Sequence, residues 1–453
     1  MNPIRIIINR LSSRNDARSS PIMRNVAASF CVKGWSMLVQ LMLVPLTLAC
    51  LGVYENGVWL TISSVLLWID NLDVGLGNGL RNKLATYIAE DNVPKAREMV
   101  SSTIAMLTAI IMPVGVVLVL AESLGDMYGL FNVSRQEIGN LPTILVIATI
   151  MVCSTFILKF LGNFYMGLQL PAINNAIVTG GNTIALIGTW LVYISGSHSL
   201  LHVAIANTAG PLLAYLICFP VTFWGRYSHL RPKLSMVKFS AMKELFDIGA
   251  KFFVLQIAGI VLFFSTNIII SRFFSPAMVT PYQIANRYFM VAMLLFTIIC
   301  VPYWSATTDA YAKHDFEWIR RANRTLNRFM LFIFLLIVFM VFVSPLVYHV
   351  WIGSKAEVPF SMTLLVGMYE FVLICSTRYS FVLNGLGKLK LQLLVTILAA
   401  VAYIPLAVFA VGQVNDIKML LAVMCCINLP GLIINALQYQ RVISGNAKGI
   451  WLK

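Results

Sequence analysis

Residues 329–347 read FMLFIFLLIVFMVFVSPLV, a run of nineteen residues without a charge. A helix needs about 20 such residues to cross the hydrocarbon core of a bilayer, so the run predicts a transmembrane helix. Similar runs recur along the whole chain and leave no room for a large soluble domain. Twelve spans are expected, at residues 26–50, 58–80, 99–121, 143–165, 176–195, 202–223, 246–270, 288–312, 326–351, 360–383, 391–411 and 420–440.

The composition of the 453 residues leads to the same class. Hydrophobic residues make up 59% and charged residues 11%, and the mean hydropathy is +0.82. Soluble domains carry roughly 25% charged residues. A chain this apolar cannot cover its surface with polar groups in water, so lipid must be most of its solvent. We therefore predict an all-α integral membrane protein.

The net charge of +15 would suit nucleic acid, but the placement of the basic residues explains it. Of 33 Lys and Arg, 24 fall in loops that would share one side of the membrane, four fall within spans, and five fall in the opposite loops. This asymmetry predicts that the basic loops and both termini are cytoplasmic. No nucleic-acid partner is expected. The five opposite residues are Arg135, Arg272, Arg287, Lys355 and Lys418.

The chain also repeats internally, with an offset of about 224 residues. The segment TYIAEDNVPKAREMV (86–100) follows the second span, and DAYAKHDFEWIRRAN (309–323) follows the eighth. Each half has six spans, so a pseudo-twofold axis along the membrane normal is expected, with a site where the halves meet. The aligned pairs are Tyr87 with Tyr311, Asp91 with Asp315 and Arg97 with Arg321.

The spans and the repeat together predict five parts of the chain. They are a basic cytoplasmic N-terminal tail (1–25), an N-terminal six-helix bundle (26–225), a cytoplasmic linker (226–245), a C-terminal six-helix bundle (246–440) and a cytoplasmic C-terminal tail (441–453).

One local motif is distinctive: DVGLGNGLRNKLA at residues 73–85, preceded by YENGVWLTISSVLLWIDN. It resembles the second helix and following loop of bacterial polysaccharide repeat-unit (O-antigen) flippases of the Wzx type. These belong to the multidrug, oligosaccharidyl-lipid and polysaccharide exporter superfamily. The resemblance implies a V-shaped pair of six-helix bundles in the bacterial inner membrane. It also implies a substrate, an oligosaccharide on a polyprenyl diphosphate, moved to the outer leaflet by alternating access, with polysaccharide polymerase and chain-length machinery as partners.

The glycines of this motif, Gly75, Gly77 and Gly79, weaken a helix and permit a break or close packing. A hinge role and a packing role are both open. The motif is not a phosphate-binding loop, because G-x-x-x-x-G-K-[ST] occurs nowhere in the chain. The eight cysteines lie in apolar runs without a CxxC pair, so no metal, disulfide or cofactor is expected.

Cations within spans are costly and point to function. Lys33, Lys159, Lys251 and Arg378 all fall in the cytoplasmic half of their predicted spans. A diphosphate arriving from the inner leaflet is a natural partner, so these four are candidate substrate-binding residues. The alternatives are snorkelling to headgroups and structural pairing. Lys33 is the strongest lumen candidate, with Asp73 as its resting partner.

Three acids also fall within spans. Asp70 and Asp73 share a helix face, and Glu370 lies near the midplane, roughly 15 Å from its outer helix end. If transport is coupled to H⁺ or Na⁺, these carboxyls are the candidate sites; ion pairing or helix packing is the alternative. Aromatic and amide residues such as Trp35 and Asn267 could line a glycan-tolerant lumen or simply join helices.

The sequence is compatible with three candidate functions. A flippase fits best, with membrane lipid and lipid-linked oligosaccharide as partners. A cation-coupled multidrug exporter would favour an acidic cavity, whereas the spans hold four cations against three acids. A membrane glycan polymerase or ligase would need a large outer loop with catalytic groups. The longest outer loop, 122–141, offers Glu122, Asp126, Arg135 and Glu137 but no His, so no enzyme is expected.

Overall fold

The computed structural model describes residues 19–71, 76–238, 261–262, 265–388 and 390–452. Its regular structure within these ranges is helical. The helices are α2 Ser19–Asn71, α3 Leu76–Ala89, α4 Val93–Leu124, α5 Met127–Phe131, α6 Leu141–Leu158, α7 Phe160–Gly167, α8 Pro171–Ile194, α9 Leu200–Phe223, α11 Pro276–Ala312, α12 Phe316–Ile352, α13 Phe360–Gly385, α14 Lys390–Val414 and α15 Ile417–Ile443, with short 3₁₀ turns η1 Ser228–Leu230, η2 Leu234–Met236 and η3 Gly449–Leu452.

Ten helices in the described part of the chain are long and apolar enough to cross a membrane. One of them, α2, consists of two helices joined at Gly52, whose φ of 68° and ψ of −175° are not helical. The first predicted span therefore ends close to where it was expected, whereas the second helix resumes directly after Gly52 and not at residue 58, because a glycine with positive φ makes the turn by itself. Most of the predicted span 246–270 lies outside the described residues. Residues 265–273, at and just beyond its end, are described and are helical.

The eighth predicted span begins earlier than expected. Helix α11 starts at Pro276, twelve residues before the predicted start at 288. Proline suits the first helical turn, and the Ser275 hydroxyl accepts the backbone N–H of Ala277 at 3.0 Å. Arg287 consequently lies inside a span. The expectation that it belongs to an outer loop was wrong, because hydropathy alone does not detect this cap.

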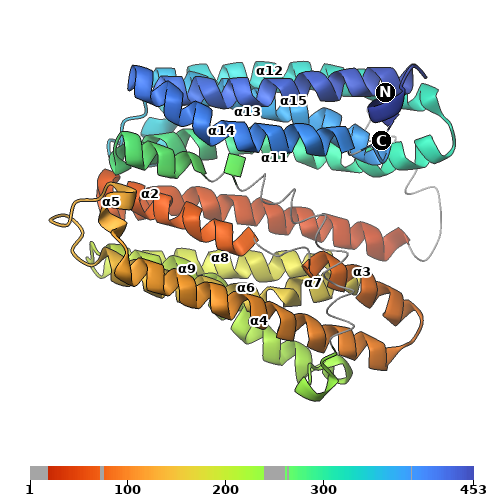
Figure 1. The fold of residues 1–453 in the computed structure, drawn as a ribbon, viewed down its shortest axis with the longest axis horizontal. Helices are drawn as coiled ribbons and strands as arrows, with labels where there is room; N and C mark the ends of the chain where they lie inside the picture. The colour runs from red at the N-terminus through yellow and green to blue at the C-terminus, as the bar shows by residue number, and fades with distance from the viewer. Residues whose placement is uncertain (1–18, 72–75, 239–260, 263–264, 389, 453) are drawn as a thin grey trace. The chain divides into compact units, whose positions relative to one another are not determined.

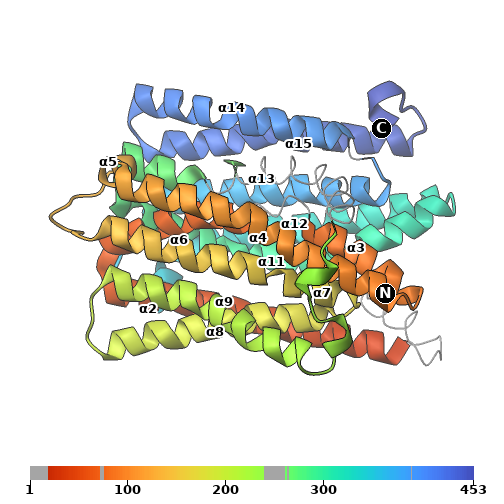
Figure 2. The same cartoon turned by 60° about the horizontal axis from the view of Figure 1, so that its bottom comes forward.

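The chain forms two compact units. Unit 1 comprises residues 1–50, 72–125 and 142–253, and unit 2 comprises 51–71, 126–141 and 254–453. Within unit 1, α8 packs along α9 and α3 packs against α4 and α7 (Figure 1). Within unit 2, α13 packs against α11 and α15, and α14 runs beside α15 (Figure 2). The five-part division expected from the sequence stays a prediction.

One turn recurs in both halves of the sequence. Asp91 after α3 and His314 after α11 both have positive φ, 52° and 55°. The next residues, Asn92 and Asp315, cap the following helix by accepting a backbone N–H three residues on. The offset is 223, so Asp315 matches Asn92 and not Asp91 as expected. The alignment had followed residue identity, whereas the structure matches backbone conformation.

A second turn recurs with a different offset. Gln169 after α7 and Gly387 after α13 have φ of 61° and 70°, and the N–H groups of Leu170 and Lys388 each bond the carbonyl five residues back. The offset here is 218. Two helix-end turns in corresponding places support a duplicated six-span unit.

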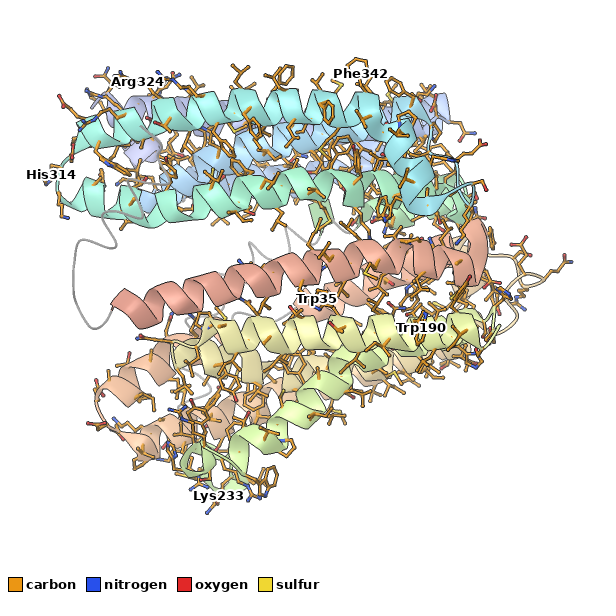
Figure 3. The ribbon with its side chains drawn as sticks, turned by 180° about the vertical axis from the view of Figure 1, so that it is seen from behind. Trp35, Trp190, Lys233, His314, Arg324 and Phe342 are labelled. Carbon is orange, nitrogen blue, oxygen red and sulfur yellow. The ribbon has the colours of Figure 1, made fainter. Side chains whose placement is uncertain are left out.

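The described part of the predicted linker is folded onto unit 1. The backbone N–H groups of Lys233 and Lys238 donate to the buried hydroxyls of Ser101 and Ser102 on α4, at 3.0 and 3.1 Å. The Lys238 ammonium also pairs with Glu98 at 2.6 Å. Figure 3 labels Lys233 in this segment. Residues up to 238 are therefore a docked strap and not a free tether.

Helix α12 shows what faces lipid. Its 37 residues extend about 55 Å, longer than a roughly 30 Å hydrocarbon core. Exposed apolar side chains follow one face, with Phe342 72% exposed, and Arg324 projects near the other end of the helix (Figure 3). An uncovered apolar face of this length is stable in lipid and not in water.

Candidate functional site

Lys33 lies on the part of α2 that belongs to unit 1, and its side chain is exposed. Helix α8 fixes this stretch: Trp35 Nε1 donates to Thr183 Oγ1 at 3.1 Å, and Thr179 Oγ1 donates to the Val32 carbonyl at 3.5 Å. Figure 3 labels Trp35, which is 49% exposed. Among the described residues Lys33 has no hydrogen bond or ion pair.

Lys159 lies at the break between α6 and α7, at the N-cap position of α7. Its backbone N–H bonds the carbonyls of Thr155 and Phe156, and its own carbonyl accepts the N–H of Gly162. The offset of 218 matches Lys159 to Thr377, the neighbour of Arg378. The fourth predicted span of each half therefore carries a cation at nearly the same position along the sequence of the span.

Arg378 on α13 is only 6% exposed. Its Nη2 donates to Asn323 Oδ1 of α12, and its guanidinium lies over the Tyr379 ring, 4.5 Å from the centroid. The Nε atom is buried without a hydrogen-bond partner, and none of the described carboxylates pairs with the guanidinium. This buried charge is thus held by a neutral amide and an aromatic face.

Glu370, two turns earlier on α13, is 5% exposed. Its Oε2 is buried without a hydrogen-bond partner. Tyr282 of α11 and its neighbour Tyr369 lie close enough to interact with it electrostatically. A charged carboxylate without a partner is costly in such surroundings. The coupling role and the packing role expected for Glu370 both stay predictions.

Arg287 is a further cation within a span, although the sequence had placed it in an outer loop. It lies on α11 one turn after Gln283, whose Nε2 donates to Asn267 Oδ1 at 2.7 Å. Two turns before it, Thr280 accepts the Asn56 amide at 3.2 Å. The i, i+4 spacing places Arg287 on the same polar face of α11. Within the described chain it has no hydrogen bond or ion pair, so unit 2 holds a second cation without a carboxylate.

The remaining predicted site residues belong to the glycine motif or lie outside the residues that the structure describes. The glycines Gly77 and Gly79 are buried in the first turn of α3, and the hinge role stays a prediction. Outside the described residues lie Asp73, Gly75, Lys251 and the side chain of Asp70.

The segment 122–141, which was expected to be an outer loop, is partly helical and is held by hydrogen bonds. Glu122 belongs to the last turn of α4, where Thr149 Oγ1 donates to its Oε1 at 2.6 Å. Within unit 2, Ser271 Oγ donates to the Phe131 carbonyl at 2.6 Å, and the Tyr54 hydroxyl accepts the Ser134 N–H at 3.0 Å. No group of three or more His, Cys, Asp or Glu that could hold a metal occurs among the described residues.

Comparisons with solved structures settle the fold. A structure titled "Inward-facing conformation of a multidrug resistance MATE family transporter of the MOP superfamily" superposes with a TM-score of 0.77, covering 93% of this chain and 98% of that one at 14% identity. The chain has the MATE transporter fold. The outward-facing structure of a MATE family transporter gives a TM-score of 0.59, with 93% and 96% covered at 15% identity.

The chain is also similar to a MOP superfamily transporter from Pyrococcus furiosus, whose binding pocket is described as having a reverse polarity that suggests a different function. Its TM-score is 0.61, with 94% of this chain and 97% of that one covered at 14% identity. The shared fold confirms the prediction of a multi-pass, all-helical membrane protein.

Sequence comparison confirms the resemblance drawn from the 73–85 motif. The chain is 21% identical over 366 residues to the "Putative O-antigen export protein" of Yersinia pseudotuberculosis, covering 78% of this chain and 81% of the relative. No family model matches the chain.

Proposed function

We propose that this protein is a flippase that moves a polyprenyl-diphosphate-linked oligosaccharide from the cytoplasmic to the outer leaflet of the bacterial inner membrane. The observation that carries the proposal is the set of cations in spans that have no carboxylate partner among the described residues: Lys33, Arg287 and Arg378. Cations in a membrane normally pair with acids. An anionic cargo supplies the missing charge when it is present.

The comparisons add support from two directions. The MATE fold provides two helical bundles suited to alternating access, and the Yersinia pseudotuberculosis relative is named for O-antigen export. In this proposal both termini and the basic loops are cytoplasmic, so the substrate meets Lys33 from the side on which it is made. Polymerase and chain-length proteins would act on the product on the outer side.

Lys33 has the clearest role in this proposal. Its exposed ammonium would bind the diphosphate, and Asp73 would be its partner between cycles. A hydrogen bond to a charged group contributes about 1.5–3 kcal/mol, so Lys33→Ala should lower flipping on the order of tenfold or more. Lys33→Arg should retain much of the activity, and Asp73→Asn should be milder than Lys33→Ala.

The test is flipping of a fluorescent polyprenyl-diphosphate oligosaccharide in proteoliposomes, beside the membrane abundance of each variant. Lys418→Ala is the matched control, because Lys418 is exposed and pairs only with Asp416 at 3.7 Å near the start of α15. Equal flipping by wild type and Lys33→Ala at equal abundance contradicts the role of Lys33. Loss of abundance in both Lys33→Ala and Asp73→Asn, restored in the double variant, would indicate a structural pair instead.

A second candidate is a cation-coupled multidrug exporter, which the MATE fold and the unpartnered carboxyl of Glu370 favour. Deleting the gene in its native host separates the two. Accumulation of a lipid-linked glycan supports the flippase, whereas drug sensitivity with normal glycan export supports the exporter. Replacing Glu370 by Gln should change the pH dependence of transport if this carboxyl carries the coupling proton.

A further inference from the structure

Unit 2 contains a pocket among α13, α14 and α15, with a volume of about 280 Å³. Seven polar side chains line it: Ser376, Thr377 and Ser380 of α13, Gln392 and Thr396 of α14, and Asn428 and Asn435 of α15. This volume lies just below the usual range for small-molecule sites.

The polar residues that line the pocket are spaced so that they share helix faces. Ser376 and Ser380 are four residues apart on α13, and Gln392 and Thr396 are four apart on α14, so each pair lies on one helix face. Three polar faces therefore converge inside a bundle whose other faces meet lipid. Polar groups inside a membrane are costly, which argues against a chance arrangement.

Hydrogen bonding argues against a simple role in joining helices. Ser380 and Thr396 donate to carbonyls of their own helices, at 3.1 and 2.9 Å, and the Asn428 amide does the same at 2.8 Å. One bond crosses between helices, from Asn435 Nδ2 to Ser380 Oγ at 3.4 Å. Side chains that glue helices together would bond across the interface, whereas these leave a hollow.

Two amide oxygens in the pocket lack partners. Asn435 is 3% exposed and its Oδ1 has no hydrogen bond, and Gln392 Oε1 is also buried and unpaired. Asn384 Oδ1 and Gln438 Oε1, one turn further along α13 and α15, are unpaired as well. An unpaired buried polar atom costs about 1–3 kcal/mol, so the two unpaired oxygens of Asn435 and Gln392 in one pocket indicate a ligand or waters that donate hydrogen bonds.

The lining defines the chemistry of the ligand. All the lining side chains are uncharged, which does not suit a diphosphate, and the volume far exceeds that of one bare metal ion. The polar acceptors suit hydroxyl donors. Leu373, Val395 and Ile427 add apolar wall against which the C–H face of a sugar ring could pack.

We propose that this pocket binds one uncharged sugar unit of the transported glycan through hydrogen bonds from sugar hydroxyls to Asn435 Oδ1 and Gln392 Oε1. The proposal rests on the proposed flippase function and names a glycan subsite for it, apart from the cations that would hold the diphosphate. The pocket lies within a few turns of the helix ends that carry Lys388, Lys390 and Arg441, the side predicted to be cytoplasmic. A sugar would therefore enter it early in the cycle.

A glycine allows the pocket to be filled without backbone strain. A Cβ at Gly431 would lie 3.8 Å from Ser376 Oγ and 3.9 Å from Val395, which is ordinary contact, so the rest of a leucine would extend into the hollow. Gly412 on α14 is the matched control, because nothing lies within 4 Å of its Cβ position and it does not line the pocket.

The experiment is saturation-transfer NMR on the purified full-length protein in detergent, with D-glucose, D-mannose and N-acetyl-D-glucosamine as probes. Wild type and Gly412→Leu should transfer saturation to at least one sugar, and Gly431→Leu should lower that transfer at least fivefold. Glucose 6-phosphate should show little transfer, since the pocket lacks cations. Gln392→Met keeps the side-chain volume and should also weaken transfer, which tests the proposal if Gly431→Leu does not fold.

Two results overturn the proposal. One is equal transfer in Gly431→Leu, Gln392→Met and the Gly412→Leu control; the other is no transfer from any sugar to folded wild type, which would leave only water in the pocket. A flipping assay on the same samples separates this from the flippase proposal. Normal flipping by Gly431→Leu removes the sugar site alone, whereas absent flipping by wild type removes the proposed function.

Discussion

The pairing of Arg378 with Asn323 allows a quantitative test of how unit 2 holds a buried charge. The guanidinium is 6% exposed and has one side-chain hydrogen-bond acceptor, Asn323 Oδ1, among the described residues. Asn323→Ala removes that acceptor and leaves the cation buried. Arg378→Met removes the charge and keeps a long apolar side chain, so it also removes the need for an acceptor.

The magnitudes follow from these contacts. A hydrogen bond to a charged group contributes about 1.5–3 kcal/mol, and hydrogen bonds between membrane helices average about 0.6 kcal/mol with a maximum near 1.7. We expect Asn323→Ala to lower the free energy of unfolding by about 2 kcal/mol, because the guanidinium keeps only its contact with the Tyr379 ring. Arg378→Met should cost less than about 1 kcal/mol.

The assay is a double-mutant cycle with SDS-induced unfolding in mixed micelles, followed by circular dichroism. The double variant should unfold like Arg378→Met, which gives an interaction energy of about 2 kcal/mol. Asn327→Ala is the control, because Asn327 is exposed one turn further along α12. Additive effects, or an Asn323→Ala cost no larger than that of the control, would refute the inference that Asn323 holds the Arg378 charge.

Three further predictions concern packing, the strap and topology. Gly57→Leu should lower the amount of folded protein several-fold in a size-exclusion assay, because its Cβ would lie 1.8 Å from the Pro276 carbonyl oxygen and overpacking costs roughly 1–3 kcal/mol or more. Ser102→Ala should cost about 1 kcal/mol and speed tryptic cleavage of the strap, since the Lys238 N–H loses its acceptor. A reporter enzyme fused after Gly196 should be active outside the cytoplasm, as the basic-loop asymmetry requires.

Each of these predictions has a control and a contrary outcome. Gly412→Leu should fold normally, and equal abundance of the two leucine variants would contradict the tight contact at Gly57. Ser123→Ala should not change proteolysis, because its hydroxyl is exposed and bonds only its own helix. A cytoplasmic reading at Gly196 would invert the whole predicted topology.

Several features of the protein were readable from residues alone because they depend on local chemistry. Long uncharged runs predicted the spans, and most of them match observed helices within a few residues. The DVGLGNGLRNKLA motif pointed to the transporter fold that comparison confirmed. Errors arose where local backbone chemistry outweighed hydropathy: Pro276 extends α11 over Arg287, and the second helix of α2 resumes directly after Gly52 without the loop expected up to residue 57.

Tertiary structure decides whether each charged or polar side chain is exposed, buried or paired. Sequence placed Lys33 and Arg378 in one class of span cations, yet one is exposed and the other is buried against Asn323, 55 residues away. The pocket of α13, α14 and α15 joins residues from Ser376 to Asn435, and no stretch of sequence contains it. Hydropathy depends on the residues of one helix, which is why the spans can be read from sequence. Burial, pairing and cavities depend on which faces of separate helices meet, and only packing in three dimensions decides that.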